Sequence, residues 1–312
     1  MSAAQTPLRI ATRRSKLALW QAQHVAALLR SAHPGIDIEL VPLSTQGDRI
    51  QDRSLAAVGG KGLFIKELEV AMQQQRADIA VHSMKDVPAE VPAEFEIAAV
   101  LERADARDAL VASHGITRLE DLPPGARVGT SSLRRQAQLC AARPDLRIEM
   151  LRGNVDTRLR RLDAGDLDAI LLACAGLMRL GLESRISARL DPKLCLPAVG
   201  QGIIGIECRG ADPRARTLLQ ALEDPGTRLA LDAERAFAAR LAGSCQSPIA
   251  AYAELHAERL TLDGLVAEPD GSRVLRDSVQ GSAAQGVLLG EQLAERLLTA
   301  GAGVLLERLR TG

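Results

Sequence analysis

The segment ADIAVHSMKDVP, residues 77–88, joins a short apolar strand to a polar stretch that follows it directly. A helix-like segment, residues 61–75, comes before it, and a strand–helix–strand pattern over residues 8–43 comes before that helix. Strands that alternate with helices in this way are typical of α/β domains with parallel sheets. The sequence therefore predicts an α/β fold in which residues 83–88 leave the carboxyl end of a strand.

The alternation repeats after residue 105 and changes at Ser247. Further strands are predicted by short apolar runs at 127–130, 147–151, 167–173 and 203–209. From Ser247 onward, shorter alternating strands with a turn at residues 269–271 precede an amphipathic helix near residues 284–299. This change of pattern predicts two α/β domains followed by a small α+β domain.

Length and composition place the chain among ordinary globular proteins. It has 312 residues, 46% of them hydrophobic, and its 39 basic and 39 acidic side chains give a formal net charge of zero. The longest apolar run, residues 169–178, is far shorter than the ~20 residues of a membrane span. No apolar secretory segment begins the chain, and its five cysteines form no CxxC pair. We expect a cytoplasmic protein with no membrane partner, no disulfide framework and no metal site.

Four reactive side chains follow the strand of the opening segment: His82, Ser83, Lys85 and Asp86. Ligands of open parallel sheets bind just past the carboxyl ends of the strands. Lys85 can tune the neighbouring carboxyl group of Asp86 and can also hold an anionic ligand. Asp86 is therefore the candidate catalytic group. The alternative is a surface ion pair at a loop, and His82 by itself is more often a structural histidine.

Small hydroxyl residues lie where a later strand ends and a helix begins: Thr130, Ser131 and Ser132. The free N–H groups at the start of a helix form an anion-binding site. Arg134 and Arg135 fall in the first turn of that helix, where two cations oppose the helix dipole unless an anion is present. An anionic ligand is therefore expected here, and the alternative is ordinary serine capping beside solvated arginines.

The arginines extend beyond this helix. Residues 127–161 hold nine arginines against three acidic residues, and Arg152 and Arg158 could face the same cleft as Arg13, which follows the first strand. Guanidinium groups suit carboxylates and phosphates. Nucleic acid is the rival ligand, but no aromatic residue lies between 127 and 161 to stack on bases. The sequence favours a small polyanion and no nucleic-acid partner.

Cys245 lies in a Gly/Ser/Pro loop, where a thiol is accessible and can ionise. The other cysteines lie in apolar settings: Cys140, Cys174, Cys195 and Cys208. Cys245 is therefore a candidate attachment point, and the alternative is a surface cysteine without a role. Gly200–Gly205 satisfies GxGxxG but opens a strand, not a helix, so a dinucleotide site is rejected. Residues 59–62 read as a lid hinge from which Lys61 could reach over a ligand.

Eight stretches of the chain, in order through nearly its whole length, resemble the porphobilinogen deaminase family. They are RIATR (9–13), VGGKGLF (58–64), ADIAVHSMKDVP (77–88), VGTSSLRRQ (128–136), LRGNVDTRL (151–159), AGLMRLGL (175–182), LPAVGQG (196–202) and GSCQSPI (243–249). The resemblance implies two α/β domains like those of type II periplasmic binding proteins and a small third domain that carries the cofactor cysteine. The implied boundaries are 1–103 with 202–219, then 104–201, then 220–312.

The resemblance also implies an activity. Members of this family, also called hydroxymethylbilane synthase, are transferases of porphyrin and heme biosynthesis. They condense four porphobilinogen molecules head-to-tail into a linear tetrapyrrole, hydroxymethylbilane, with release of ammonia at each addition. The implied primer is a dipyrromethane cofactor joined to Cys245 by a thioether. A monomer that passes its product to uroporphyrinogen-III synthase is implied as well.

Site residues follow from the matching motifs. Asp86 is implied as the catalytic carboxylate that faces the pyrrole N–H groups. The cofactor is expected to contact Lys85, Asp86, Thr130, Ser131, Ser132, Arg134 and Arg135. The substrate is expected to contact Arg13, Ser15, Lys61, Arg152, Arg158, Arg179 and Gln201.

The chain departs from the family pattern at Gln46, Asp156, Ser244 and Ser247, none of which removes a reactive group. Two other classes of function remain open on the residues alone. A non-catalytic anion-binding module would need the arginines but not Cys245. An RNA-binding protein would use residues 127–161 and would show a steep dependence of its affinity on salt.

Overall fold

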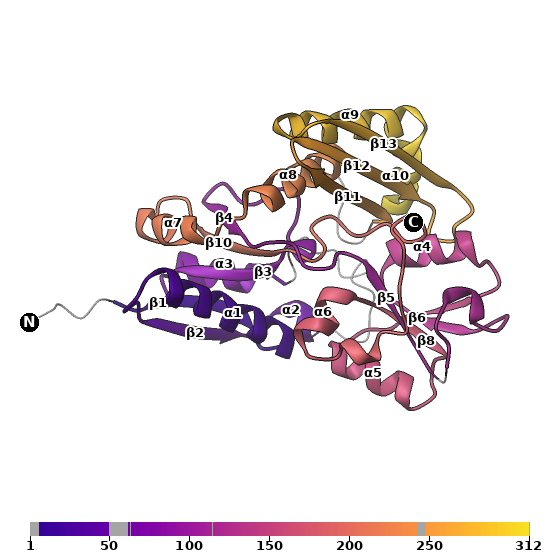
Figure 1. The fold of residues 1–312 in the computed structure, drawn as a ribbon, viewed down its shortest axis with the longest axis horizontal. Helices are drawn as coiled ribbons and strands as arrows, with labels where there is room; N and C mark the ends of the chain where they lie inside the picture. Colours follow the sequence, from indigo (N-terminus) through magenta and orange to yellow (C-terminus); the bar gives the residue numbers. More distant parts are fainter. Residues whose placement is uncertain (1–5, 50–61, 63, 114, 242–246, 312) are drawn as a thin grey trace, which may run out of the picture.

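The computed structural model describes residues 6–49, 62, 64–113, 115–241 and 247–311. They form two five-stranded sheets and one three-stranded sheet, each covered by its own helices (Figure 1). The first two sheets lie side by side, and the third lies across the top of both in the view of Figure 1. The predicted α/β class with a small α+β unit at the C-terminal end is confirmed.

The first sheet has the strand order β2-β1-β3-β10-β4. Its strands are β1 (Leu8–Arg13), β2 (Ile38–Leu43), β3 (Ile79–Ser83), β4 (Phe95–Val100) and β10 (Ile204–Arg209). Its helices are α1 (Lys16–Ala32), α2 (Gln46–Arg49), α3 (Lys66–Gln73) and α7 (Pro213–Leu219). β1 runs parallel to β2 and β3, as predicted, but β10 is antiparallel to both of its neighbours. The prediction of a purely parallel sheet is wrong there, because β10 returns from the second sheet in the opposite direction.

Helices cover both faces of this sheet because β1 and β3 are apolar on both sides. The apolar face of α1 packs on Ile10 and Ile79, and α3 packs on Ala11 and Ala80. Burial on both faces is typical of sheets with crossover helices. α1 begins after Ser15, whose Oγ accepts a hydrogen bond from Ala18 N (3.3 Å).

The second sheet has the order β7-β6-β8-β5-β9. Its strands are β5 (Asp108–Ala112), β6 (Arg127–Gly129), β7 (Arg147–Glu149), β8 (Ala169–Ala173) and β9 (Ala188–Arg189). Its helices are α4 (Leu133–Ala142), α5 (Val155–Asp163) and α6 (Cys174–Arg179). β6 is parallel to β7 and β8, whereas β5 is antiparallel to β8 and β9. In each α/β sheet a single strand, β10 or β5, runs opposite to the others, and it lies next to the edge strand.

The third sheet is an antiparallel meander that packs on helices. It consists of β11 (Ile249–His256), β12 (Arg259–Ala267), β13 (Val274–Ser282), α8 (Pro225–Arg240), α9 (Gly286–Thr299) and α10 (Ala302–Thr311). Phe237 of α8 is fully buried in its core with Leu262 and Leu293. A Cβ atom on Gly264 would lie 2.7 Å from the Phe237 ring, so the strand must carry glycine there.

Two segments join the first two sheets: residues 101–107 and residues 190–203. They lie against each other, because Ala104 N donates to Gly202 O (3.2 Å). Gly202 has a φ of +88°, and a Cβ atom on it would lie 2.5 Å from Ala104 O. Only glycine allows this close approach. Among the helices that the structure describes, we find none long and apolar enough to cross a membrane.

Candidate active site

Asp86 lies in a short 3₁₀ turn, Met84–Asp86, that follows β3. Met84 is buried and anchors this turn, and its N–H donates to Ile203 O (3.0 Å). Its side chain fills the space above Gly200 and Gly205, where a Cβ atom would lie within 3.0 Å of it. The contacts of Met84 thus anchor the turn to the protein interior. The Asp86 side chain remains 34% exposed and available to a ligand.

Arg13 ends the neighbouring strand β1 and approaches Asp86. Its Nη1 lies 4.0 Å from Asp86 Oδ2, and its guanidinium lies 4.2 Å from the centre of the Phe64 ring. The strands β1 and β3 are adjacent and parallel, so their carboxyl ends bring these two side chains together. The sequence-based pairing of Arg13 with the Asp86 site agrees with this geometry. Ser15, expected beside the substrate, caps α1 here.

Arg158 approaches the same site from the second sheet. Its Nε donates to Gly153 O (2.7 Å) at the start of α5. Burial lowers the pKa of Arg158 to about 10, the charges of Arg135 and Arg152 add to the shift, and Asp86 opposes it. The guanidinium stays protonated at neutral pH. Its interaction with Asp86 shows that the two sheets face each other across the site.

Lys85 is half-buried among these charges. Burial lowers the pKa of Lys85 to about 8, and the Asp86 carboxylate opposes this shift. Arg135 and Arg134 lower the pKa further, whereas Asp108 raises it. An anionic ligand at this position would favour the ammonium form, because an opposite charge stabilises the protonated state.

Arg134 and Arg135 both bind Asp108, a residue that the sequence analysis did not single out. Arg134 Nη1 donates to Asp108 Oδ2 (2.7 Å), and Arg135 Nη2 donates to Asp108 Oδ1 (2.7 Å). All three side chains are buried. Burial alone would raise the pKa of Asp108, but the two guanidiniums outweigh it and hold the pKa far below its usual range. The sequence predicted an anion beside these arginines, and within the described residues that anion is the carboxylate of Asp108. The alternative of solvated arginines is wrong, because both side chains are buried.

Gln201 completes this buried group. Its Nε2 donates to Asp108 Oδ1 (2.9 Å) and to Ala106 O (2.6 Å). The hydroxyl residues before α4 also bond within the protein. Ser132 caps the helix, Ser131 Oγ donates to Leu151 O (2.6 Å), and Thr130 Oγ1 accepts from Ser132 N (3.2 Å). These side chains form the wall of the site on the second sheet.

His82 lies outside this constellation. It is buried, and its Nε2 lies 2.8 Å from Oε2 of Glu207, which comes from the adjacent strand β10. This partner accounts for the imidazole as a structural group, the reading that the sequence analysis preferred.

Arg179 contacts the segment that follows Gln201, between the two α/β sheets. Its Nη2 donates to Gly202 O (2.7 Å), and its guanidinium lies 5.9 Å from the centre of the Trp20 ring. Burial alone lowers the pKa of Arg179 to about 10, whereas the charges of the cleft act on Arg158. The structure therefore brings Arg13, Lys85 and Arg158 to Asp86 but leaves Arg179 at the junction between the sheets.

Lys61 and Cys245 lie outside the described residues. The four described cysteines are poor nucleophiles. Burial raises the pKa of Cys174, Cys195 and Cys208 to about 12, and it also raises the pKa of Cys140. Within the described ranges, no three His, Cys, Asp or Glu residues are placed to hold a metal ion.

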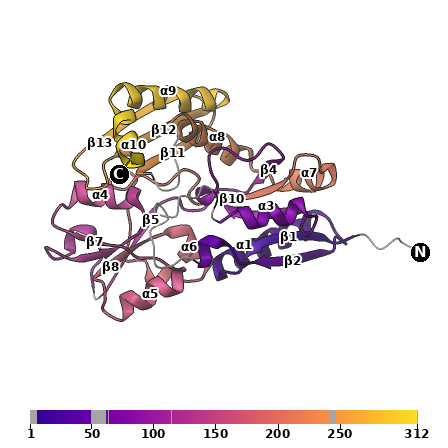
Figure 2. The same ribbon diagram turned by 180° about the vertical axis from the view of Figure 1, so that it is seen from behind.

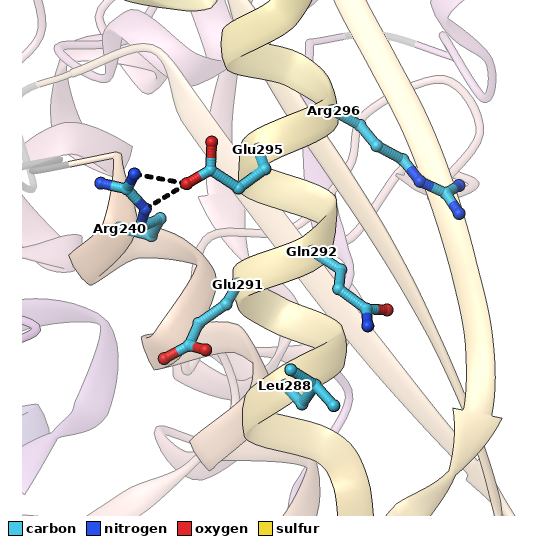
Figure 3. Close-up of a pocket in the computed structure, with 6 residues that line it drawn as sticks. All are labelled: Arg240, Leu288, Glu291, Gln292, Glu295 and Arg296. Atoms are coloured by element: carbon cyan, nitrogen blue, oxygen red, sulfur yellow. Dashed lines mark hydrogen bonds and ion pairs between the residues drawn. The ribbon is translucent and has the colours of Figure 1, made fainter.

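A separate hollow lies on the surface of the third domain, between α8 and α9 (Figure 3). Arg240 and Glu295, which line it, form an ion pair with each other. None of the predicted site residues lines this hollow, so it is not the candidate site.

Comparisons with known proteins bear on the whole chain. The family model described as "Porphobilinogen deaminase, dipyromethane cofactor binding domain" matches residues 8–217, and "Porphobilinogen deaminase, C-terminal domain" matches residues 229–299. Proteins named porphobilinogen deaminase from Xanthomonas euvesicatoria pv. vesicatoria (strain 85-10) and Xanthomonas axonopodis pv. citri (strain 306) are each 56% identical over 304 residues. Each alignment covers 97% of this chain and 100% of the relative.

Among solved structures, the periplasmic VFT2 domain of Bordetella pertussis BvgS matches with a TM-score of 0.42 and 14% identity. That match covers 69% of this chain and 86% of the domain. The two family models and the full-length relatives decide the family. The chain belongs to the porphobilinogen deaminase family.

Proposed function

We propose that this enzyme condenses four porphobilinogen molecules into hydroxymethylbilane on a dipyrromethane that is joined to Cys245 by a thioether. The observation that carries the proposal is the position of Asp86. It is a partly exposed carboxylate 4.0 Å from Arg13, with Lys85 beside it and Arg158 facing it from the other sheet. A single carboxylate among cations suits a reaction in which acidic substrates pass through a cationic state.

The charges of the site fit a polyanionic ligand. Asp108 balances Arg134 and Arg135 only in part, and the cations Arg13, Lys85 and Arg158 add to them. Among the described residues, these five cations are accompanied by two carboxylates, Asp108 and Asp86. Such a group of cations would attract the acetate and propionate arms of pyrrole rings.

When bound, the dipyrromethane supplies the pyrrole carbon to which the first substrate is joined. Asp86 accepts hydrogen bonds from pyrrole N–H groups and stabilises positive charge that develops on the ring beside it. In its protonated form it gives a proton to the amine, which leaves as ammonia, and the resulting carboxylate takes up the proton that is released when the new carbon–carbon bond forms. Arg13 and Arg158 hold carboxylate arms from opposite sides, which orients the ring over Asp86. Lys85, whose pKa is about 8, binds carboxylates most strongly below that pH.

The three sheets support three domains with the boundaries 1–103 and 202–219, 104–201, and 220–312. In this division the cleft lies between the first two domains, and the third carries Cys245. Both α/β domains contribute cations to the same carboxylate, which is what a ligand bound between them requires. We propose a monomer that works in the cytoplasm and passes its product to uroporphyrinogen-III synthase.

The attachment to Cys245 is tested by the mass of the intact chain purified from cells. We expect an added mass of two linked pyrrole units, located on the peptide that contains Cys245. Cys245→Ala should lack the added mass and the activity, and Cys140→Ala is the matched control that should retain both. An unmodified wild-type chain with full activity would refute the primer. Retained ligand affinity in Cys245→Ala, together with an inactive wild type, would favour a non-catalytic anion-binding module.

A further inference from the structure

The turn between β12 and β13, residues 268–273, rests on helix α4 of the second domain. α4 lies beneath the third sheet in both ribbon views (Figure 2). Gly271 of this turn has a φ of +73°, and a Cβ atom on it would lie 2.4 Å from Ala141 N and 2.8 Å from Ala137 O. Both atoms belong to the backbone of α4, which cannot turn aside as a flexible side chain does. Only glycine therefore allows the turn to lie directly on the helix.

Further contacts between the second and third domains surround this turn. Buried apolar side chains from α4, the crossing segment and the third sheet pack together: Ala137, Leu196, Ala250, Leu265 and Ala267. Arg276 of β13 adds hydrogen bonds to the crossing segment, from Nη1 to Lys193 O (2.6 Å) and from Nη2 to Pro192 O (3.2 Å). The turn is thus one part of a continuous contact that holds the third sheet on α4.

Strand β12 connects this contact to the part of the chain that contains Cys245. The strand ends at Ala267, whose N–H donates to Pro248 O (3.1 Å), and Pro248 follows Cys245 by three residues. On the other side of the contact, the first turn of α4 carries Arg134 and Arg135, which belong to the wall of the site. One strand and one helix therefore link the chain beside Cys245 to this wall.

We propose that Gly271 is a positioning residue for the reaction, because it seats the β12–β13 turn on α4 and so sets the distance between the attachment point at Cys245 and the wall of the site. The proposal rests on the proposed function for the group attached to Cys245, whereas the seating of the turn does not. A primer tied at one end follows any displacement of its anchor, which would move its reacting ring relative to Asp86. A displacement of about 1 Å can lower a rate on the order of 10²-fold.

Cys140 of α4 reports whether the turn is seated. It is half-buried, and a Cβ atom on Gly271 would lie 2.8 Å from its carbonyl carbon. Burial raises the pKa of the Cys140 thiol, and the charge of Asp270 in the turn adds to the shift. Gly271→Ala should move the turn away from α4, which exposes this thiol and removes the charge beside it. The rate of Cys140 alkylation by iodoacetamide, measured on its peptide by mass spectrometry, should rise about three-fold or more.

Steady-state kinetics of the Gly271→Ala holoenzyme test the effect on the reaction. We expect kcat to fall about ten-fold while KM for porphobilinogen stays within about two-fold, because Arg13 and Arg158 are not part of the turn. Gly165→Ala is the matched control, since Gly165 has a φ of +78° and no heavy atom lies within 4 Å of its Cβ position. It introduces similar backbone strain without the clash. It should leave kcat and the alkylation of Cys140 unchanged, even where it lowers the thermal midpoint.

Arg276→Gln tests the same contact if Gly271→Ala does not fold. It removes the hydrogen bonds to Lys193 O and Pro192 O without changing the backbone, and it should lower kcat and speed Cys140 alkylation about two-fold each. Arg276→Lys, which keeps one donor, should restore both values in part. An unchanged alkylation rate in the folded variant would overturn the seating, and faster alkylation with an unchanged kcat would overturn the positioning role. A wild-type chain without the two-pyrrole mass would instead count against the proposed function and leave the alkylation result standing.

Discussion

Asp86 combines a backbone turn that is anchored by a buried side chain with an accessible carboxylate. The buried Met84 side chain fixes the turn that carries it, and Arg13 and Arg158 face its carboxylate from different sheets. The chemistry of the site should therefore depend on this side chain more than on any neighbouring cation.

Asp86→Asn should fold normally but lower turnover by about 10²–10⁴-fold, since the amide cannot carry the negative charge or donate the proton. Steady-state turnover and the thermal midpoint should be measured on the same preparation. Glu90→Gln, at an exposed carboxylate four residues away, is the matched control and should retain activity. Near-normal turnover of Asp86→Asn would remove Asp86 from its proposed role.

Asp108 is the buried counter-charge of two buried arginines of the second α/β domain. Asp108→Asn should destabilise the protein by about 3–5 kcal/mol, because it leaves the buried Arg134 and Arg135 without a counter-charge. The measurement is urea unfolding followed by circular dichroism. Because the folded-state pKa of Asp108 is depressed, this contribution is present above the unfolded pKa of about 4 and is lost as the pH falls below it.

The exposed ion pair between Arg185 and Asp163 provides the control for Asp108→Asn. Asp163→Asn removes the partner of Arg185 at the surface and should alter stability by less than about 1 kcal/mol. Equal losses for Asp108→Asn and Asp163→Asn would show that the buried charges do not need Asp108.

In the first α/β domain, the packing of α3 against the sheet should depend on pH, because Glu69 of α3 is a partly buried carboxyl group. Burial raises the pKa of Glu69 on α3 to about 7, and the charge of Glu207 adds to the shift. His82 and Lys66 oppose it, whereas Glu94 raises the pKa further. The folded state therefore holds a proton that the unfolded chain loses near pH 4.5. Stability should fall as the pH rises from about 4.5 to 7 and should stay lower above that range.

Glu69→Gln removes this ionisation. It should stabilise the protein at pH 8 on the order of 1 kcal/mol, a value reduced for the partial exposure of the side chain, and should have little effect at pH 5. The midpoint of urea unfolding at the two pH values measures the difference. Glu39→Gln, at an exposed position on β2, should show no such dependence. A loss of stability at pH 8 would contradict the raised pKa.

The helices and central strands could be predicted because their patterns are local. The sequence pattern predicted a strand, a helix and a strand over residues 8–43, and β1, α1 and β2 lie there. The pattern did not reveal β4, β5 or β9, nor α10 at the C-terminal end. The antiparallel direction of β10 depends on where the chain returns after the second domain. No local pattern encodes that path.

Site residues, too, could be predicted where the signal is local in the sequence and could not where it depends on distant partners. Arg13, Lys85 and Asp86 could be predicted because polar side chains at the carboxyl ends of strands are conspicuous in the sequence. Asp108 could not, since it opens an apolar strand and its arginine partners are 26 and 27 residues away. Arg179 was assigned with the substrate contacts by its motif, and only the structure places it beside Trp20 and Gly202.

On the scale of the whole molecule, one buried carboxylate connects all three parts. Glu234 of α8 pairs with Arg103 in the crossing segment (2.7 Å) and accepts hydrogen bonds from Gly200 N (2.7 Å) and Ala253 N (2.8 Å). Arg103 also lies 5.3 Å from the centre of the Tyr252 ring. The third domain is thus attached at the segments between the other two.

Lys16 of α1 and Asp156 of α5 form an ion pair (2.7 Å) between the two α/β domains. Both side chains are solvent-exposed, so the pair should contribute less than about 1 kcal/mol and should not hold the cleft closed. A double-mutant cycle of Lys16→Gln and Asp156→Asn, measured by urea unfolding, should give a coupling energy of that size that vanishes in 0.5 M NaCl. Arg161→Gln and Asp166→Asn, an exposed pair within one domain, should behave alike. A coupling above about 2 kcal/mol that persists in salt would show instead that Asp156 latches the domains together.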